Sequence, residues 1–279
     1  MLLRTELKNK FIFFFLNFKS MTNHMLTNIH PKAKIGKNVI IEPFATVYED
    51  VEIGDNCWIA SNAVIMDGAR IGNNCKIFPG AIISADSQDL KYNGEYATTE
   101  IGDNTTIREY VTIHKGTSDK KTTIVGSNCL LMSYVHVAHD CVIGNNVVIA
   151  NLVQLAGHVF VGNWVIIEGT AAIQQFVNIG EHSFIAGGSL VRKNVPPYVK
   201  AAREPLSYIG VNTIGLRRRG FNDQQIINIE DIYRVIYVQN SNMTTALRVA
   251  ELEVPVSDEK EVILEFIRNS TKGIMRGLS

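Results

Sequence analysis

An aliphatic side chain returns at every sixth position along most of this chain. The frame starts with Ile29, Ile35 and Ile41, and its last member is Val191. Four residues after each of these positions the side chain is Ala, Val, Cys, Thr or Ser. A strand alternates faces with a period of two and a helix repeats every ~3.6 residues, so neither alone explains this period. The pattern predicts short strands joined by sharp corners, with the aliphatic and the small side chain both pointing inward.

Three such units form a coil of 18 residues. One coil cannot bury a core, but stacked coils can, with backbone hydrogen bonds between coils about 4.8 Å apart. We expect this solenoid to span residues 29–197. Two insertions break the frame, at 83–100 and 119–124. Loops that leave a rigid scaffold often carry binding chemistry, and the alternative is a tolerated surface insertion.

The six-residue period ends near Tyr198, and residues 198–279 are predicted to form a small helical domain. Asn222 is a candidate N-cap. Apolar residues follow it at helical spacing up to Ile236, and further helical patterns cover 243–252 and 258–268. Such a domain would cover the open edge of the last coil.

The charge balance and the cysteines narrow the class of protein. Lys and Arg number 27 and Asp and Glu also number 27, so the chain lacks the basic excess of a nucleic-acid-binding protein. The cysteines all occupy the small inward position, and none forms a CxxC pair: Cys57, Cys75, Cys129 and Cys141. We therefore expect buried, reduced thiols and a reducing, cytoplasmic location.

The first 28 residues precede the repeat and contain an apolar run from Phe11 to Leu16. The run is short for a signal peptide, no A-x-A site follows it, and it is far below the ~20 residues of a membrane helix. Translation starting at Met21 or Met25 would remove it. We predict a dispensable extension and no integral membrane segment, with a membrane tether as the alternative.

Histidines cluster where the coil length brings them together. Asp140 and His158 are 18 residues apart, as are His139 and Gly157, so each pair stacks on neighbouring coils. A histidine can take the proton of a hydroxyl nucleophile, and a glycine allows close approach to its backbone N–H, a donor for an oxyanion. We predict an acyl transfer with His139 as general base, Gly157 as oxyanion donor and Asp140 supporting the imidazolium.

Two other interpretations of this cluster remain open from the residues alone. Several histidines with an aspartate can bind zinc. They can also be solvated loop side chains without a function.

Several segments together resemble the UDP-N-acetylglucosamine O-acyltransferase family within the hexapeptide-repeat acyltransferases. They are 88–95, 107–109, 112–117, 136–141, 155–158, 175–176, 210–212 and 215–221. The resemblance implies an all-β left-handed parallel β-helix, although general crossover rules favour the right hand. It implies transfer of an (R)-3-hydroxyacyl chain from acyl carrier protein to the glucosamine 3-hydroxyl of UDP-N-acetylglucosamine, the first step of lipid A biosynthesis.

The resemblance also assigns roles residue by residue. It makes His139 the base and the Gly157 amide the oxyanion donor. Residues near the sugar would be Asp89, Lys91, His158 and Gln175. Residues near the nucleotide would be His136, Asn212, Arg218 and Arg219, and Gly169 and Gly187 would line the acyl channel. Clustered arginines suit phosphate, although a solvated charge run is the better interpretation of Arg218 and Arg219 without the resemblance.

The family further implies a homotrimer with each site in a cleft between two subunits, and neither metal nor cofactor. Gly187 matches the position that measures the acyl chain, which predicts a long acyl group. This chain has Gln174 where some members have a histidine, so we expect that position to support rather than catalyse. Alternatives are a sibling transferase with another sugar or coenzyme A, a 3-amino UDP-sugar acceptor, and a non-catalytic or carbonic-anhydrase-like protein.

Overall fold

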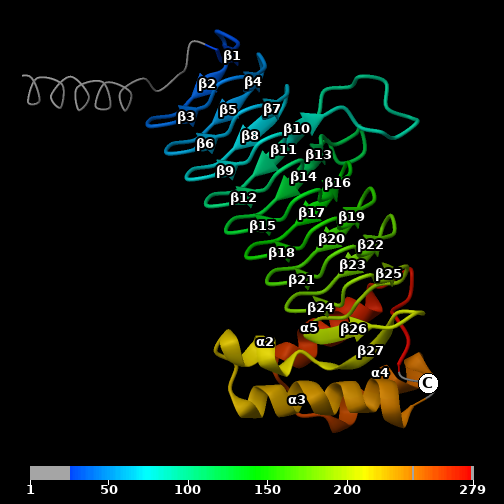
Figure 1. Cartoon of the computed structure of the whole chain (residues 1–279). Coiled ribbons are helices and arrows are strands. Elements are labelled where there is room, and N and C mark those ends of the chain that lie inside the picture. The colour runs from blue at the N-terminus through cyan, green and yellow to red at the C-terminus, as the bar shows by residue number, and fades with distance from the viewer. Residues whose placement is uncertain (1–25, 241, 278–279) are drawn as a thin grey trace, which may run out of the picture.

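The computed structural model describes residues 26–240 and 242–277 and shows a triangular solenoid followed by helices (Figure 1). Three sheets of short strands run the length of the solenoid, and every pairing between solenoid coils is parallel. The left-handed parallel β-helix predicted from the sequence is thereby confirmed. The prediction of a dispensable extension over residues 1–28 concerns mostly residues 1–25, which lie outside the described residues. Strand β1 already begins at Asn28, the last residue of the predicted extension.

The chain visits the three sheets in turn, and we number them in that order. Sheet 1 contains β1 Asn28–Ile29, β4 Thr46–Val47, β7 Val64–Ile65, β10 Ile82–Ala85, β13 Thr112–His114, β16 His136–Val137, β19 Gln154–Leu155, β22 Ala172–Ile173 and β25 Leu190–Val191. Sheet 2 contains β2 Lys34–Ile35, β5 Glu52–Ile53, β8 Ala69–Ile71, β11 Thr98–Ile101, β14 Thr122–Val125, β17 Val142–Ile143, β20 Phe160–Val161 and β23 Asn178–Ile179. Sheet 3 contains β3 Ile40–Ile41, β6 Trp58–Ile59, β9 Lys76–Ile77, β12 Thr106–Ile107, β15 Leu130–Leu131, β18 Val148–Ile149, β21 Ile166–Ile167, β24 Phe184–Ile185, β26 Val199–Ala202 and β27 Ser207–Val211.

The register repeats the 18-residue coil, because Val137 pairs with Leu155 and Leu155 with Ile173. Both predicted inward positions are buried, as Val137 and Cys141 show with no exposed surface. The four cysteines are buried and free, as predicted. Corner residues adopt left-handed backbone angles, which Asn and Asp tolerate better than most residues; Asp140 has φ 58°. The short strands and these corners together give the period of six.

The inserted loops have other limits than the sequence predicted. The first occupies residues 86–97 rather than 83–100, because Thr99 to Ile101 pair with Ala69 to Ile71 and continue sheet 2. The second occupies residues 115–121 rather than 119–124, because Thr122 already pairs with Thr98. The first loop projects from the solenoid beside β10 and β13 (Figure 1). Both loops lie between sheet 1 and sheet 2.

The C-terminal part begins with strands rather than helices. Strand β26 continues sheet 3 by pairing with β24, and β27 returns antiparallel to β26. Four α-helices follow: α2 Thr213–Arg218, α3 Asp223–Arg234, α4 Met243–Glu253 and α5 Asp258–Arg268, with a π-turn η1 Val235–Gln239 after α3. Asn222 caps α3 in a capping box with Gln225, which confirms the predicted N-cap. In the described residues no helix is both long and apolar enough to cross a bilayer.

Candidate active site

Most of the predicted site residues lie at or beside the corners of the triangular coil, where side chains leave the core. The corner between sheets 1 and 2, which we call the histidine corner, comprises residues 138–141, 156–159 and 174–177 on three successive coils. Backbone hydrogen bonds stack these turns: the N–H of His158 donates to the carbonyl of His139, and that of Phe176 to the carbonyl of Gly157. The coil length therefore places positions 139, 157 and 175 in one column, as predicted.

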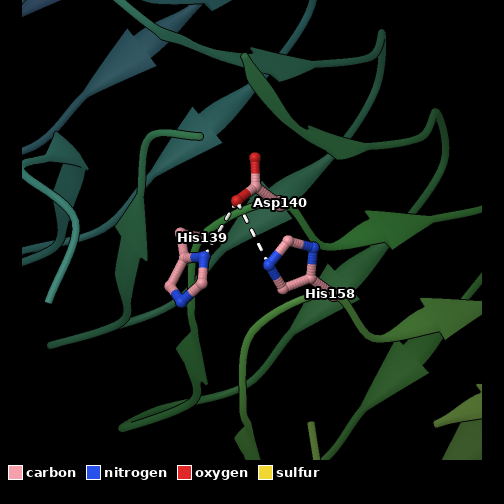
Figure 2. Close-up of side chains that lie close together, drawn as sticks. All are labelled: His139, Asp140 and His158. Carbon is pink, nitrogen blue, oxygen red and sulfur yellow. Dashed lines mark hydrogen bonds and ion pairs between the residues drawn. The ribbon is translucent and has the colours of Figure 1, made fainter. Parts of the chain in front are cut away.

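His139 and Asp140 form the central pair of this corner (Figure 2). The Nδ1 atom of His139 lies 2.9 Å from Oδ2 of Asp140. Both side chains are largely buried, and the carboxylate of Asp140 has no exposed surface. Because Nδ1 faces a carboxylate, Nε2 is the ring nitrogen left to meet a substrate.

His158 approaches the same carboxylate from the next coil. Its Nε2 lies 3.6 Å from Oδ2 of Asp140, and its ring stands edge-on to that of His139 with centroids 5.0 Å apart. On its other side Nδ1 lies 3.4 Å from Asp119 of the second loop, and Phe176 stacks beneath the ring. His158 is thus held between two carboxylates and an aromatic face.

Gly157 lies directly against the ring of His139. A Cβ atom at this position would come within 2.5 Å of both Cε1 and Nε2 of that ring. The amide of Ala156 donates to the carbonyl of Ile173 and that of His158 to His139, whereas the Gly157 amide makes no hydrogen bond within the described residues. Glycine therefore permits the close approach of the His139 ring, and this amide is a donor of the kind that an oxyanion needs.

Asp140 stays ionised although it is buried. Burial by itself would raise the pKa of Asp140, but hydrogen bonds from the Thr117 side chain and backbone and from His139, with the nearby His158, hold this pKa below its usual value. A carboxylate that stays charged can stabilise an imidazolium formed during proton transfer.

The first loop brings Asp89 to the histidine corner. Oδ2 of Asp89 lies 3.8 Å from Nε2 of His139, on the side opposite Asp140. Lys91 follows on the loop surface; its backbone N–H donates to Asp89, and its side chain is exposed. Gln175 lies two coils after His139, where its backbone carbonyl accepts a hydrogen bond from the Lys272 side chain. The structure thus brings Asp89 to the base and leaves Lys91 at the rim.

His136 lies on the outer face of sheet 1, one strand before His139. Its Nδ1 is 2.8 Å from the Thr112 hydroxyl, and its ring stands edge-on to that of His114. Burial, together with the smaller effects of the neighbouring His114 and His139, lowers the pKa of His136 to about 4. A neutral His136 can donate or accept a hydrogen bond near a phosphate but brings no charge to it.

Acid is expected to destabilise the fold through three such histidines. Burial is the main cause that lowers the pKa of His114, His136 and His182 below the 6.5 of an unfolded chain. Below that pH the unfolded chain therefore binds more protons than the folded chain. The free energy of unfolding should be unaffected by these histidines above about pH 6.5 and should decrease as the pH falls toward about 4. We expect the urea midpoint to fall between pH 7 and about pH 5, and to fall less in His136→Asn. If the urea midpoint fell equally with pH in the wild type and in His136→Asn, His136 would not contribute to the loss of stability in acid.

Unlike His136, the predicted nucleotide residues Asn212 and Arg219 lie at another corner, between sheets 2 and 3. The side chain of Asn212 caps α2 by accepting from Gly215, and it donates to the carbonyl of His182. Arg219 lies over the Trp164 ring and within 3.3 Å of Nδ1 of His182. Arg218 is exposed. This tryptophan corner, which comprises 162–165, 180–183 and Tyr198, is distinct from the histidine corner.

The predicted acyl-channel glycines lie at the third corner, between sheets 3 and 1. Gly169 and Gly187 occupy equivalent places on successive coils, and a Cβ at Gly187 would lie 3.3 Å from the carbonyl oxygen of Gly169. The predicted residues are therefore distributed over three corners of one subunit. Only the base, its carboxylate, the oxyanion glycine and the sugar-binding candidates Asp89, His158 and Gln175 share the histidine corner.

Sequence reasoning gave no role to two residues that contact the histidine corner. Thr117 donates to Asp140, and Asp119 faces His158. Both belong to the second loop. Thr117 is the small residue four positions after Ile113, so spacing alone predicts an inward core side chain there, whereas Asp119 lies where the six-residue frame is lost. The signal for Asp119 was that the loop interrupts the frame beside the histidines.

The side chains of the histidine corner include ligand types that bind metal ions. In the described chain, ligand atoms of His139, Asp140 and His158 all lie within 4.8 Å of one another. The set is that of a possible zinc site, but the Asp140 oxygens already accept hydrogen bonds from Thr117 and His139. The absence of a metal requirement remains a prediction.

A hexapeptide β-helix with a buried His–Asp pair against a glycine defines a hexapeptide-repeat transferase. A model described as "Bacterial transferase hexapeptide (six repeats)" matches residues 32–65, 50–85 and 122–157, and one described as "Udp N-acetylglucosamine O-acyltransferase; Domain 2" matches 194–275. The chain is 51% identical over 256 residues to an acyl-[acyl-carrier-protein]--UDP-N-acetylglucosamine O-acyltransferase of Sulfurihydrogenibium sp., covering 89% of this chain and 94% of the relative. The enzyme of the same name from Trichlorobacter lovleyi is 48% identical over 261 residues, 92% of this chain and 100% of that one.

Solved structures agree with these relatives. A UDP-N-acetylglucosamine acyltransferase from Bacteroides fragilis superposes with a TM-score of 0.89 at 50% identity, covering 91% of this chain and 99% of that one. The enzyme from Francisella novicida gives a TM-score of 0.88 at 37% identity, covering 91% and 94%. The chain belongs to the UDP-N-acetylglucosamine O-acyltransferase family.

Proposed function

We propose that this protein transfers an (R)-3-hydroxyacyl chain from acyl carrier protein to the 3-hydroxyl of UDP-N-acetylglucosamine, the first step of lipid A biosynthesis. The observation that carries the proposal is the His139 ring, held by Asp140 at Nδ1 and lying against Gly157 at Nε2. Names of the relatives support the substrates, since they name an acyl carrier protein and UDP-N-acetylglucosamine.

In this mechanism Nε2 of His139 removes the proton of the sugar hydroxyl while the oxygen attacks the thioester carbon of the acyl donor. Asp140 keeps the Nδ1 proton in place and stabilises the imidazolium. The Gly157 amide donates to the oxyanion of the tetrahedral intermediate. The intermediate then collapses, the C–S bond breaks, and the proton on His139 passes to the leaving thiolate. Asp89, Lys91, His158 and Gln175 would bind the sugar.

We further propose that the protein acts as a cytoplasmic homotrimer. The support is the distribution of candidate residues over three corners of one subunit: the nucleotide candidates Asn212 and Arg219 lie at the tryptophan corner, a different corner of the coil from that of His139. A neighbouring subunit would bring such a corner, or the one with Gly169 and Gly187, against the histidine corner. Residues 198–279 would form the closing domain of each subunit.

One experiment separates this proposal from its alternatives. The purified protein is incubated with UDP-N-acetylglucosamine, its 3-amino analogue and other UDP-sugars, each with acyl carrier protein thioesters or acyl coenzyme A, and products are identified by mass. We expect ester product with the carrier-protein donor. Product only with coenzyme A or another sugar would indicate a sibling transferase, and no product with any pair would overturn the assignment.

Removal of metal ions is expected to leave turnover unchanged. The proton transfer requires only the imidazole and Asp140, whose oxygens already bind protein donors. Dialysis against EDTA followed by the acyl-transfer assay tests this. Loss of activity that zinc restores would instead favour a metal at His139, Asp140 and His158.

A further inference from the structure

The second inserted loop surrounds the carboxylate of Asp140. The Thr117 hydroxyl donates to Oδ2 at 2.6 Å, and the Thr117 backbone N–H donates to Oδ1 at 2.9 Å. The backbone N–H of Lys120 approaches the same Oδ1 at 3.3 Å. In return, the Asp140 N–H donates to the hydroxyl of Thr123 at 2.8 Å. One short segment, 117–123, thus determines the position of both the backbone and the side chain of Asp140.

Contacts at its base and on its outer side hold this loop in place. At its base, Gly116 lies so close to the backbone of Lys121 and Thr122 that any Cβ would overlap them. On its outer side, the carboxylate of Glu95 from the first loop accepts the N–H of Ser118 at 2.9 Å. Thr117 is itself buried, with 7% of its surface exposed. Its hydroxyl therefore faces Asp140 with little freedom to turn elsewhere.

The hydroxyl of Thr117 shares Oδ2 with the reacting histidine. Oδ2 accepts from Thr117, lies 2.9 Å from Nδ1 of His139 and lies 3.6 Å from Nε2 of His158. Without the Thr117 hydroxyl, Oδ2 of Asp140 loses one of its hydrogen bonds. The carboxylate can then rotate away from His139 and toward His158. Fixing this oxygen therefore keeps the carboxylate against Nδ1 of His139 and away from Nε2 of His158, and so determines the tautomer and the orientation of the His139 ring.

We infer that Thr117 is a positioning residue for acyl transfer, acting through Asp140 on His139, and that the second loop is a working part of the site. The inference rests on the proposed function for its kinetic test. Thr117 does not reach the substrate in this role, so its removal should change turnover and leave substrate binding nearly unaltered. It should also change the titration of the pair, since the donated hydrogen bonds keep the Asp140 pKa low.

The kinetic test compares Thr117→Val with Thr117→Ser. We expect the valine variant, which has nearly the volume of threonine but no hydroxyl, to lose about tenfold or more in kcat with KM for the UDP-sugar changed less than about twofold. The acid limb of kcat/KM should move to higher pH, because a more basic carboxylate retains a proton on the pair. The charged or titratable groups that face the His139–Asp140 pair are unchanged in both variants: His114, His136, His158, Asp89, Asp119 and Glu95. Serine should restore most of the activity and the pH profile.

Thr105→Val is the matched control. Thr105 is fully buried and its hydroxyl also bonds backbone groups, of Gly126 and Cys129, but at a different corner. We expect it to lower thermal stability while kcat and the pH profile stay at wild-type values. A valine variant at position 117 with unchanged kcat and pH profile would overturn the inference, and so would a serine variant as defective as valine.

A second readout does not depend on turnover. In the free protein, the side-chain ¹⁵N signals of His139 should report a proton fixed on Nδ1, and in Thr117→Val a mixture of both tautomers. The same spectrum in both proteins would overturn the inference even if acyl transfer is confirmed. Absence of acyl transfer in the wild type would count against the proposed function alone. If the valine variant folds poorly, Thr117→Cys keeps a side chain of similar size with a weaker donor and is measured in the same way.

Discussion

His139→Ala is expected to lower kcat by about 10²–10⁴-fold, because it removes the group that takes the proton of the sugar hydroxyl. The side chain is buried at a corner and not in the apolar core, so the coil should remain folded. KM for the UDP-sugar should change far less than kcat, since binding groups remain on the loop and the neighbouring coils. Steady-state kinetics with the carrier-protein thioester, together with a thermal melt, measures both quantities.

The control for this variant is His30→Ala. His30 is a half-exposed histidine in the first coil, near Glu49 and remote from the histidine corner in sequence and in the stack of coils. It should retain wild-type kcat. Turnover within a few fold of wild type in His139→Ala would remove this residue from the mechanism and leave His158 as the next candidate base.

The period of six was sufficient to predict the solenoid, because both inward positions are under direct packing constraint in every coil. Val137 and Cys141 are fully buried, so a charged or much bulkier side chain at either position would disrupt the stack. The same reasoning could not place β26 and β27, which extend sheet 3 past residue 197. These strands are held by pairing with β24 and with each other, and no repeat marks them.

For the site, spacing alone was enough where the chain stays in the coil. An interval of 18 residues placed His139 on Gly157 and brought Asp140 near His158, and the structure agrees in each case. Spacing could not place Asp89 or Thr117, which reach the corner through loops whose course depends on their own contacts. Nor could it show that one subunit holds the nucleotide candidates and the base on different corners.

Gly157→Ala is expected to cost at least about 10²-fold in kcat while the protein still folds. The added Cβ would lie 2.5 Å from Cε1 and Nε2 of His139, closer than any real contact, so one of the two groups must move. The imidazole is the end of a side chain and moves more easily than the stacked backbone. It would swing away from Asp140 and from the position that the sugar hydroxyl occupies, and a shift of about 1 Å is enough for a loss of this size.

Gly54→Ala separates this effect from a general cost of adding a methyl group to the coil. At position 54 the Cβ would meet the backbone of Gly72 at 2.7 Å, in an early coil outside the histidine and tryptophan corners, where the coil cannot easily give way. This variant should therefore lose more thermal stability than Gly157→Ala and yet keep a higher kcat per folded molecule. If both variants kept wild-type kcat, contact between residue 157 and the His139 ring would have no part in catalysis. The glycine's small size would then matter only for packing, and a different donor would have to stabilise the oxyanion.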